Sequence, residues 1–449
     1  MEQHVTLEQM LAARDARQER IAAALGGTPL ISFSLNIPGP VKYSPSILRA
    51  YREGQRWLTE AFGGKLTLLS SCEDVTGCEA LYAVGDDALN AKKRCAAMED
   101  GDALGRLFDM DVIDSDGRKI ERTELGLDER GCMVCGAPGR GCAARRLHSV
   151  EQLQQETARR LTAFFFAQDR DFLSALAAAS LLEEVHTTPK PGLVDRANNG
   201  SHSDMDLALF EKSAAALTHY WGECFTIGAE TACLNGAETF RRLRAEGLAA
   251  EGRMLEATGG VNTHKGAIFI MGILCGAAGR LWKLEEPSQR AESLCEECAK
   301  MTEQILREEL EQLSGETALT AGERLYLKHG LQGARGEVMR GLPGVREIAL
   351  PALRCALAQG CVREHAAAIT LLHLIARGTD TNLFKRGGAD GAAWAAASAA
   401  ALLQQSPFPS SDQIAELDRQ FVERNLSPGG CADLLAATLF LHDWEMQRG

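Results

Sequence analysis

Residues 172–185, FLSALAAASLLEEV, show the pattern that decides the fold of most of this chain. Apolar and small residues recur there at helical spacing, and no glycine or proline interrupts them. Similar alanine- and leucine-rich stretches predict helices at residues 205–216, 269–281, 293–313, 362–375, 389–403 and 432–446. Because strand patterns are nearly absent beyond residue 150, we expect an all-α domain of roughly ten helices at residues 166–449.

The first third of the chain has a different pattern. Residues 30–36, LISFSLN, alternate in part between apolar and polar side chains, and IPGP at 37–40 predicts a turn after that strand. Further strands are predicted at residues 65–69, 80–84 and 106–113, and helices at residues 7–25, 46–62 and 87–98. We therefore expect an α/β or α+β domain at residues 1–165, followed by a helical connector at residues 149–167.

Length and composition exclude several classes of protein. A chain of 449 residues with 45% hydrophobic residues is expected to form two or three globular domains. It has no apolar run long enough to cross a membrane, and its first residues do not resemble a secretory signal, so we expect a cytoplasmic protein with no membrane partner. In that compartment the 14 cysteines are expected to be reduced. The net charge of −13 argues against nucleic acid as a partner.

Five loops of the helical part concentrate glycine with polar and charged residues. The first, residues 187–206, holds Lys190 between two prolines and ends at Asp204 and Asp206, either of which could simply cap a helix. The second, GGVNTHKG at 259–266, carries Asn262, His264 and Lys265 before an apolar helix. Free N–H groups at a helix N-terminus beside a lysine suit a phosphate, although the histidine could equally be structural.

The other three loops add further polar groups. GARGE at 333–337 presents Arg335, which could grip a phosphate or pair with a surface glutamate. The last two loops supply oxygen and nitrogen groups of the kind that Mg²⁺ and phosphates require, at Asp380, Asn382, Arg386, Ser427, Gly429 and Asp433. Each loop alone is more typical of a helix terminus than of a site, but the five together predict a phosphate-binding site.

Two motifs stand out in the first domain. Asp109 and Asp111, in GRLFDMDVID, point to one face of a predicted strand, where Mg²⁺ would relieve their repulsion, although an exposed strand face is the alternative. Cys132, Cys135, Cys142 and His148 have spacing that permits a Cys₃His zinc site. Free thiols beside basic residues are the alternative for this second motif.

The helical part resembles triphosphoribosyl-dephospho-CoA synthase over roughly residues 173–442. The resemblance rests on HTTPKPGLVDRANNGSHSDMD, GGVNTHKGAIF, GARGE, DTNLFKRGG and NLSPGGCADLLAATLF, which occur in this order. It implies that ATP and 3′-dephospho-CoA react with release of adenine, through an oxocarbenium-like transition state. Such a reaction needs a carboxylate base and cations for the triphosphate.

The resemblance assigns expected roles to the loop residues. We expect Lys190, Lys265, Arg335 and Arg386 to bind phosphates. Further substrate contacts are expected from Asn262, His264, Asn382, Ser427 and Gly429. Four carboxylates are candidates for Mg²⁺ ligation or for the general base, and the sequence does not separate the two roles: Asp204, Asp206, Asp380 and Asp433.

The first domain resembles apo-citrate lyase phosphoribosyl-dephospho-CoA transferase over roughly residues 6–150. LISFSLNIPGPVKYSP, GRLFDMDVID and RGCMVCGAPGRGCAARRLHS carry the resemblance. It implies that a serine of the citrate lyase acyl carrier (gamma) subunit attacks the α-phosphate, with loss of diphosphate, in a nucleotidyltransferase-type reaction. Asp109 and Asp111 would bind Mg²⁺, and the turn from Asn36 to Gly39 would shape the pocket. Phosphate contacts are expected from Lys42, Arg106 and Arg118.

Together the two resemblances predict a bifunctional transferase, in which the product of the second domain is the substrate of the first. Two alternatives stay open. The chain could serve the carrier of malonate decarboxylase, whose synthase looks similar. The first domain could also be a zinc-bearing docking module without catalysis.

Overall fold

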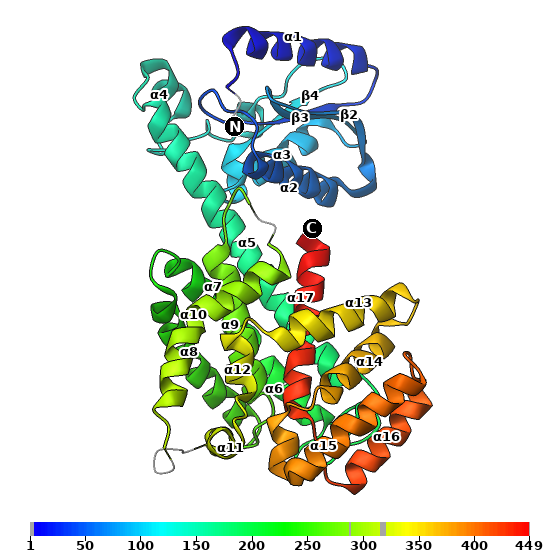
Figure 1. The fold of residues 1–449 in the computed structure, drawn as a ribbon. Coiled ribbons are helices and arrows are strands. Elements are labelled where there is room, and N and C mark those ends of the chain that lie inside the picture. Colours follow the sequence, from blue (N-terminus) through cyan, green and yellow to red (C-terminus); the bar gives the residue numbers. More distant parts are fainter. Residues whose placement is uncertain (1–3, 287–288, 315–319, 449) are drawn as a thin grey trace. The chain divides into compact units, whose positions relative to one another are not determined.

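The computed structural model describes residues 4–286, 289–314 and 320–448, which divide into two compact units (Figure 1). Unit 1 contains Met1–Gln168 and Leu284–Glu286, and unit 2 contains Asp169–Lys283 and Pro287–Gly449. Unit 1 combines a sheet with helices, and the described residues from 150 onward are helical, so the predicted fold class is confirmed. No helix among the described residues is long and apolar enough to span a membrane.

Unit 1 is built on a four-stranded antiparallel sheet. Its strands are β1 (Leu30–Leu35), β2 (Leu66–Asp74), β3 (Gly77–Val84) and β4 (Phe108–Ile113), in the order β2-β3-β1-β4. The hairpin of β2 and β3 is longer than the sequence predicts. β2 is an edge strand and is largely exposed, so its second half can form a strand without alternating apolar and polar residues. The sequence of that half is therefore typical of a loop.

Helices cover both faces of this sheet (Figure 1). Helix α1 (Leu7–Ala24) lies on one face, and α2 (Pro45–Phe62) and α3 (Ala88–Gly101) lie on the other, whereas the short α4 (Gly139–Arg145) lies apart from both layers. The core lies between the sheet and the layer of α2 and α3, where Phe33 stacks on Tyr51 with ring centroids 5.4 Å apart. Strand β4 buries Phe108, Met110 and Val112 in this core. Asp109 and Asp111 therefore point to the opposite face, as the period of a strand requires.

Helix α5 (Val150–His186) joins two segments that the sequence analysis treats separately. The predicted connector and the predicted helix at 172–185 form one helix of 37 residues, because no proline or glycine breaks the chain between them. Its first part belongs to unit 1 and its second part to unit 2.

The remaining helices form unit 2. They are α6 (Leu207–Ala216), α7 (Thr218–Glu230), α8 (Gly236–Ala257), α9 (Lys265–Leu281), α10 (Ala291–Glu311), α11 (Ala321–His329), α12 (Gly333–Met339), a π-helical turn (Gly344–Ala349), α13 (Leu350–Ala358), α14 (Arg363–Ala376), α15 (Thr381–Gln405), α16 (Ser411–Glu423) and α17 (Gly429–Arg448). This is more than the roughly ten helices expected. The predicted ranges do not include α7, α8, α11, α12, α13 or α16. The exposed face of α8 is rich in arginine and glutamate, whereas the predicted stretches are rich in alanine and leucine.

Helix α9 lies at the centre of unit 2. It packs against α7, α8, α10 and α17, and its residues are buried almost all round. A helix in such a position is apolar on every side, as residues 266–279 are. Its N-terminus meets the N-termini of α15 and α17, and this meeting point is where the predicted loops converge.

Candidate active sites

A cavity of about 620 Å³ opens in unit 2 where the N-termini of α9, α15 and α17 meet. The loop at residues 187–206 and the segment before α12 complete its wall. Helix N-termini carry unsatisfied N–H groups and positive partial charge, so three of them around one space create a strong site for an anion. Two carboxylates already use part of this capacity, because Asp380 accepts from N–H groups at the starts of α15 and α17, and Asp433 accepts from one at the start of α9.

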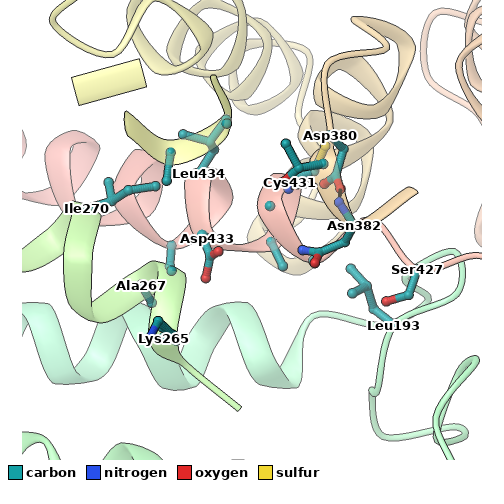
Figure 2. Close-up of a pocket in the computed structure, with 18 of the residues that line it drawn as sticks. Leu193, Lys265, Ala267, Ile270, Asp380, Asn382, Ser427, Cys431, Asp433 and Leu434 are labelled. Atoms are coloured by element: carbon teal, nitrogen blue, oxygen red, sulfur yellow. Dashed lines mark hydrogen bonds between the residues drawn. The ribbon is translucent and has the colours of Figure 1, made fainter. Parts of the chain in front are cut away.

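Most of the residues predicted for a phosphate site line this cavity. They are Lys190, Asp204, Asn262, His264, Lys265, Asp380, Asn382, Arg386, Ser427, Gly429 and Asp433. Residues 190 and 433 are far apart in the sequence, and it is the packing of α5, α9 and α17 that brings them to one space. Figure 2 shows part of this lining.

Asp433 projects from the first turn of α17 toward α9 (Figure 2). The backbone N–H of Ala267 donates a hydrogen bond to its carboxylate. This approach depends on Gly266, since a Cβ there would lie 1.9 Å from Asp433 Oδ2. Burial raises the pKa of Asp433 well above its ordinary value, and the nearby Glu184 and Asp380 raise it further. A carboxylate with a raised pKa in a cavity is a suitable proton acceptor.

Asp380 has a different environment. It is buried, it caps α15, and its Oδ1 accepts hydrogen bonds from the backbone N–H groups of Asn382 (2.7 Å) and Leu383 (3.1 Å). Its Oδ2 accepts a bond of 2.8 Å from the N–H of Cys431 at the start of α17. Burial raises the pKa of Asp380, and these hydrogen bonds offset part of that effect. The carboxylate thus joins the N-termini of α15 and α17.

The predicted cations are already engaged with neighbouring groups. Lys190 is buried, and its Nζ lies 2.7 Å from both Oε1 and the backbone oxygen of Glu184. Lys265 pairs with Glu251 at 2.7 Å, but its side chain is about half exposed. Arg386 donates to the backbone oxygen of Ser201 and to Asn425 Oδ1, both at 2.8 Å. Of the three, only Lys190 forms a fully buried ion pair.

His264 is the buried histidine of the cavity wall. Burial, and then the charge of Lys190, lower its pKa to about 3, so the ring is neutral at physiological pH. Its Nδ1 lies 2.7 Å from Ser213 Oγ, and that hydroxyl accepts a hydrogen bond from Thr263. Its buried Nε2 has no hydrogen-bond partner among the described residues. Buried nitrogens normally find a partner, so this atom is suited to a bound ligand.

Two predicted residues lie elsewhere. Asp206 is the N-cap of α6, and its carboxylate accepts a 2.9 Å bond from the backbone N–H of Leu209. Arg335 lies outside this cavity and pairs with Glu323 at 3.0 Å. Both residues thus have the structural contacts that the sequence left open as alternatives.

The sequence analysis missed other residues of the cavity wall, among them Glu184, Glu337 and Arg377. Glu184 left one signal, because it follows a strongly apolar stretch of α5, where a charge must find a partner. Glu337 and Arg377 form a partly buried ion pair between α12 and the end of α14. Nothing in the local sequence indicates that pair.

A second polar cavity, of about 1,100 Å³, lies in unit 1 beside β4. Its lining includes the predicted residues Asn36, Arg106, Asp109 and Asp111. It also includes the basic residues Lys92, Lys119, Arg122 and Arg130, and three members of the predicted Cys₃His cluster, Cys132, Cys142 and His148. The carboxylate pair and the cysteine cluster thus border one space, which the sequence does not reveal.

Asp109 and Asp111 oppose Ser34 and Ser32 of β1 on the same face of the sheet. Desolvation by the surrounding atoms, and then the charge of Asp111, raise the pKa of Asp109, although part of its surface stays open to solvent. Lys119 Nζ lies 2.7 Å from Asp111 Oδ1. A cation therefore already lies beside the pair, as their repulsion demands.

Lys119 and Arg130 are functional candidates that the sequence analysis missed. Lys119 follows an Asp-Gly turn, which folds the chain back so that Lys119 bridges to Ile113 at the end of β4. That turn was the available signal. Arg130 donates to the backbone oxygens of Phe108 (2.7 Å) and Arg106 (3.1 Å), and so fixes the start of β4.

Three predicted residues do not line this cavity. Arg118 is exposed and pairs with Glu124 at 2.8 Å. Lys42 donates to the backbone oxygen of Ile37 and thereby closes the turn that the sequence predicts. Gly39 has a φ of 83° in that turn, a conformation that suits glycine.

The predicted cysteine cluster forms. Ligand atoms of Cys132, Cys135, Cys142 and His148 all lie within 4.8 Å of one another, with 3.5 Å between the sulfurs of Cys135 and Cys142 and 3.2 Å from Cys135 Sγ to His148 Nε2. The tight turn at Gly136 and the short α4 bring the four side chains together. Such a donor set can hold a metal ion, and three thiolates with one imidazole are typical of zinc.

Comparisons with known proteins match each part of the chain to a family. Residues 170–449 match the model of the family CitG, ATP:dephospho-CoA triphosphoribosyl transferase. Residues 5–164 match the model of CitX, apo-citrate lyase phosphoribosyl-dephospho-CoA transferase. The chain is 34% identical over 456 residues to "Protein CitXG" of Haemophilus influenzae, which covers 97% of this chain and 96% of that protein. The chain belongs to the fused CitX–CitG family.

Similarity extends to relatives that contain only the synthase part. A 2-(5''-triphosphoribosyl)-3'-dephosphocoenzyme-A synthase of Pectobacterium atrosepticum is 48% identical over 268 residues, covering 60% of this chain and 87% of that protein. The protein of the same name from Klebsiella pneumoniae is 43% identical over 274 residues, covering 60% of this chain and 90% of that protein.

This CitX–CitG protein is therefore a bifunctional transferase for the prosthetic group of citrate lyase. Its CitG part makes triphosphoribosyl-dephospho-CoA from ATP and dephospho-CoA, and its CitX part transfers phosphoribosyl-dephospho-CoA to apo-citrate lyase. Both predicted resemblances are confirmed. The CitX family is a transferase family for apo-citrate lyase. This match therefore argues against both alternatives, a malonate decarboxylase carrier and a docking module without catalysis.

Proposed function

We propose that the cavity of unit 2 is the active site of the synthase and that residues 166–449 form its domain. The observation that supports this most is the meeting of three helix N-termini around the buried carboxylate of Asp433. The N-termini would bind the triphosphate of ATP, with Lys265 and Arg386 at its edge. Asp204, Asn262, Asn382, Ser427 and Gly429 would contact other polar groups of the substrates.

Asp433 is the proposed general base. It takes the proton from the ribose 2′-hydroxyl of dephospho-CoA, whose oxygen forms a bond with C1′ of the ATP ribose. The bond from C1′ to adenine breaks, and the electron pair of that bond leaves with adenine. His264 lines the cavity with a neutral ring and would contact the substrate there. Asp380 then has a positioning role, because its oxygens already bind three backbone N–H groups.

Lys190 is buried, and its ion pair with Glu184 already balances its charge. It would therefore hold Glu184 in place in the cavity wall and would not bind a phosphate directly. We leave Asp206 and Arg335 outside the synthase site on the basis of their contacts. A bound Mg²⁺ would neutralise charge on the triphosphate. Asp433 would hold that ion only in place of its role as base, and the oxygens of Asp380 already bind three backbone N–H groups.

Replacing Asp433 by Asn tests the synthase assignment. It keeps the shape of the side chain and removes the base, so adenine release from ATP is expected to fall by about 100-fold or more. Asp390→Asn on the exposed surface of α15 is the matched control. If Asp433→Asn and Asp380→Asn both released adenine at the normal rate, the assignment would be wrong.

For unit 1 we propose that the cavity beside β4 is the transferase site and that residues 1–165 form its domain. A serine of the citrate lyase acyl carrier subunit attacks the α-phosphate of the triphosphoribosyl group, and diphosphate leaves. Asp109 and Asp111 fit a Mg²⁺ ion, which would neutralise phosphate charge. Arg106 and Lys119 line the same space as phosphate contacts. We also propose a cytoplasmic location, where the 14 cysteines, all free in this structure, would stay reduced.

The transferase proposal is tested with Asp111→Asn. We expect loss of mass gain on the apo-carrier, while adenine release by the same protein stays normal. Asp116→Asn, in the exposed turn before Lys119, is the matched control. Carrier loading at the normal rate by Asp111→Asn would refute the site.

We also propose that the Cys₃His cluster binds zinc and so holds residues 130–148 in the wall of the transferase cavity. Cys135→Ser is expected to remove the metal, measured by elemental analysis, whereas the exposed Cys233→Ser keeps it. A purified protein with no metal in the wild-type form, yet with full transferase activity, would exclude this role.

A further inference from the structure

A further cavity, of about 500 Å³, adjoins the synthase cavity in unit 2. Helices α8, α9 and α11 and the end of α10 form its wall. The two cavities share part of their lining, namely Lys265, Gly266, Leu331, Gln332, Gly333, Ala334 and Thr381. The two spaces therefore lie next to each other, and we call the second one the side cavity.

The side cavity differs in character from the synthase cavity. Its wall is mainly apolar and includes Leu243, Phe269, Ile273, Leu310 and Tyr326. A ligand that fills it would remove apolar surface from water at about 25 cal/mol per Å². The side cavity thus favours a long, weakly polar group over a phosphate.

The charged residues of the side cavity support the same conclusion. Arg244 pairs with Glu309 (3.0 Å between Nη2 and Oε2), Lys265 with Glu251 (2.7 Å), and Arg335 with Glu323 (3.0 Å). All six residues belong to its lining. Because each cation has its own carboxylate, the side cavity offers little net charge to a polyphosphate. Arg335, expected to hold a phosphate, thus lies where charge is already balanced.

We propose that the side cavity binds the pantetheine arm of dephospho-CoA. This rests on the proposed location of the synthase site. The 2′-hydroxyl of dephospho-CoA must reach Asp433, so its adenosine occupies the synthase cavity. The pantetheine arm is long, flexible and uncharged, and in this proposal it passes from the polar region between the residues that line both cavities. The side cavity is the apolar space that this wall adjoins.

Gly247 on α8 offers a specific test, because it lines the side cavity and does not line the synthase cavity. A Cβ at this position would contact Tyr220 at 3.4 Å and Ile268 at 4.0 Å, which are ordinary distances. Gly247→Leu should therefore fold and fill the space, since leucine also favours a helix. Gly252→Leu, on the same helix with open space around it, is the matched control.

The experiment measures KM for dephospho-CoA and for ATP by adenine release, together with inhibition by ADP against dephospho-CoA at saturating ATP. ADP has the adenosine diphosphate of dephospho-CoA without the arm. For Gly247→Leu we expect KM for dephospho-CoA to rise by about tenfold, and the other two constants to change by less than about twofold. Gly252→Leu should change none of the three.

Two outcomes would overturn the inference. A rise in KM for ATP with no change for dephospho-CoA would place the adenine of ATP in the side cavity. No change in any constant would show that the side cavity binds neither substrate. Both differ from a failure of the proposed synthase site, in which Asp433→Asn would release adenine at the normal rate.

Discussion

The dependence of Asp433 on Gly266 leads to the sharpest prediction. In Gly266→Ala the new methyl group would lie 1.9 Å from Asp433 Oδ2, a distance that no real contact of this kind shows. The carboxylate or the start of α9 must then move by about 1 Å. A displacement of that size of a reacting group can reduce turnover by roughly 100-fold. The expected result is a fall of that order in the kcat of adenine release.

The substitution also separates geometry from stability. Alanine favours a helix over glycine by about 1 kcal/mol, so the folded protein should tolerate the change if α9 or Asp433 adjusts. Gly252→Ala, on the exposed face of α8, makes the same chemical change with open space around it. It should leave kcat unchanged. Transferase activity, measured with supplied triphosphoribosyl-dephospho-CoA, reports whether unit 1 is intact in both variants. A kcat within about threefold of normal in Gly266→Ala would refute the role of this contact.

Two further predictions concern stability. Lys190→Met leaves Glu184 buried without its partner, so the free energy of unfolding in urea should fall by about 3–5 kcal/mol, and a loss below about 1 kcal/mol would contradict the buried pair. Asp433→Asn should raise Tm at neutral pH, because it removes a desolvated charge. The pKa of Asp433 is higher in the folded protein than in the unfolded chain. The stability that this group contributes to the wild-type protein is therefore fully present below its unfolded pKa of about 3.9, and it is lost as the pH rises through the folded pKa. The gain in Tm should thus be larger at pH 8 than at pH 5, and a gain that shrinks with rising pH would show the opposite shift.

Local patterns were sufficient to predict most elements of the fold. Strand β4 shows apolar residues at every second position, and α9 and α17 are long apolar stretches after glycine-rich loops, so their types follow from the sequence. The second half of β2 and helix α8 were missed because both are exposed on one side. Such elements are stabilised by their neighbours more than by their own pattern.

The sites were predictable in residue type but not in arrangement. The loops around Lys190, Lys265, Asp380 and Asp433 could be recognised from their composition, since capping alone does not require lysine or arginine beside glycine. That Gly266 admits Asp433 to the N-terminus of α9 depends on the packing of two helices far apart in the sequence. The pairing of Lys190 with Glu184 and of Arg335 with Glu323 also arises from tertiary contacts. Local sequence therefore does not reveal which of these cations are already paired with a carboxylate.

We propose that each unit carries one complete active site, the synthase site around Asp433 and the transferase site around Asp111. The most direct measurement follows free adenine and the mass of the apo-citrate lyase carrier with ATP, Mg²⁺ and dephospho-CoA. Asp111→Asn should release adenine without a gain in carrier mass. Asp433→Asn should release adenine about 100-fold more slowly or worse, but should load the carrier when triphosphoribosyl-dephospho-CoA is supplied. Normal adenine release by Asp433→Asn, or carrier loading by Asp111→Asn, would contradict the account.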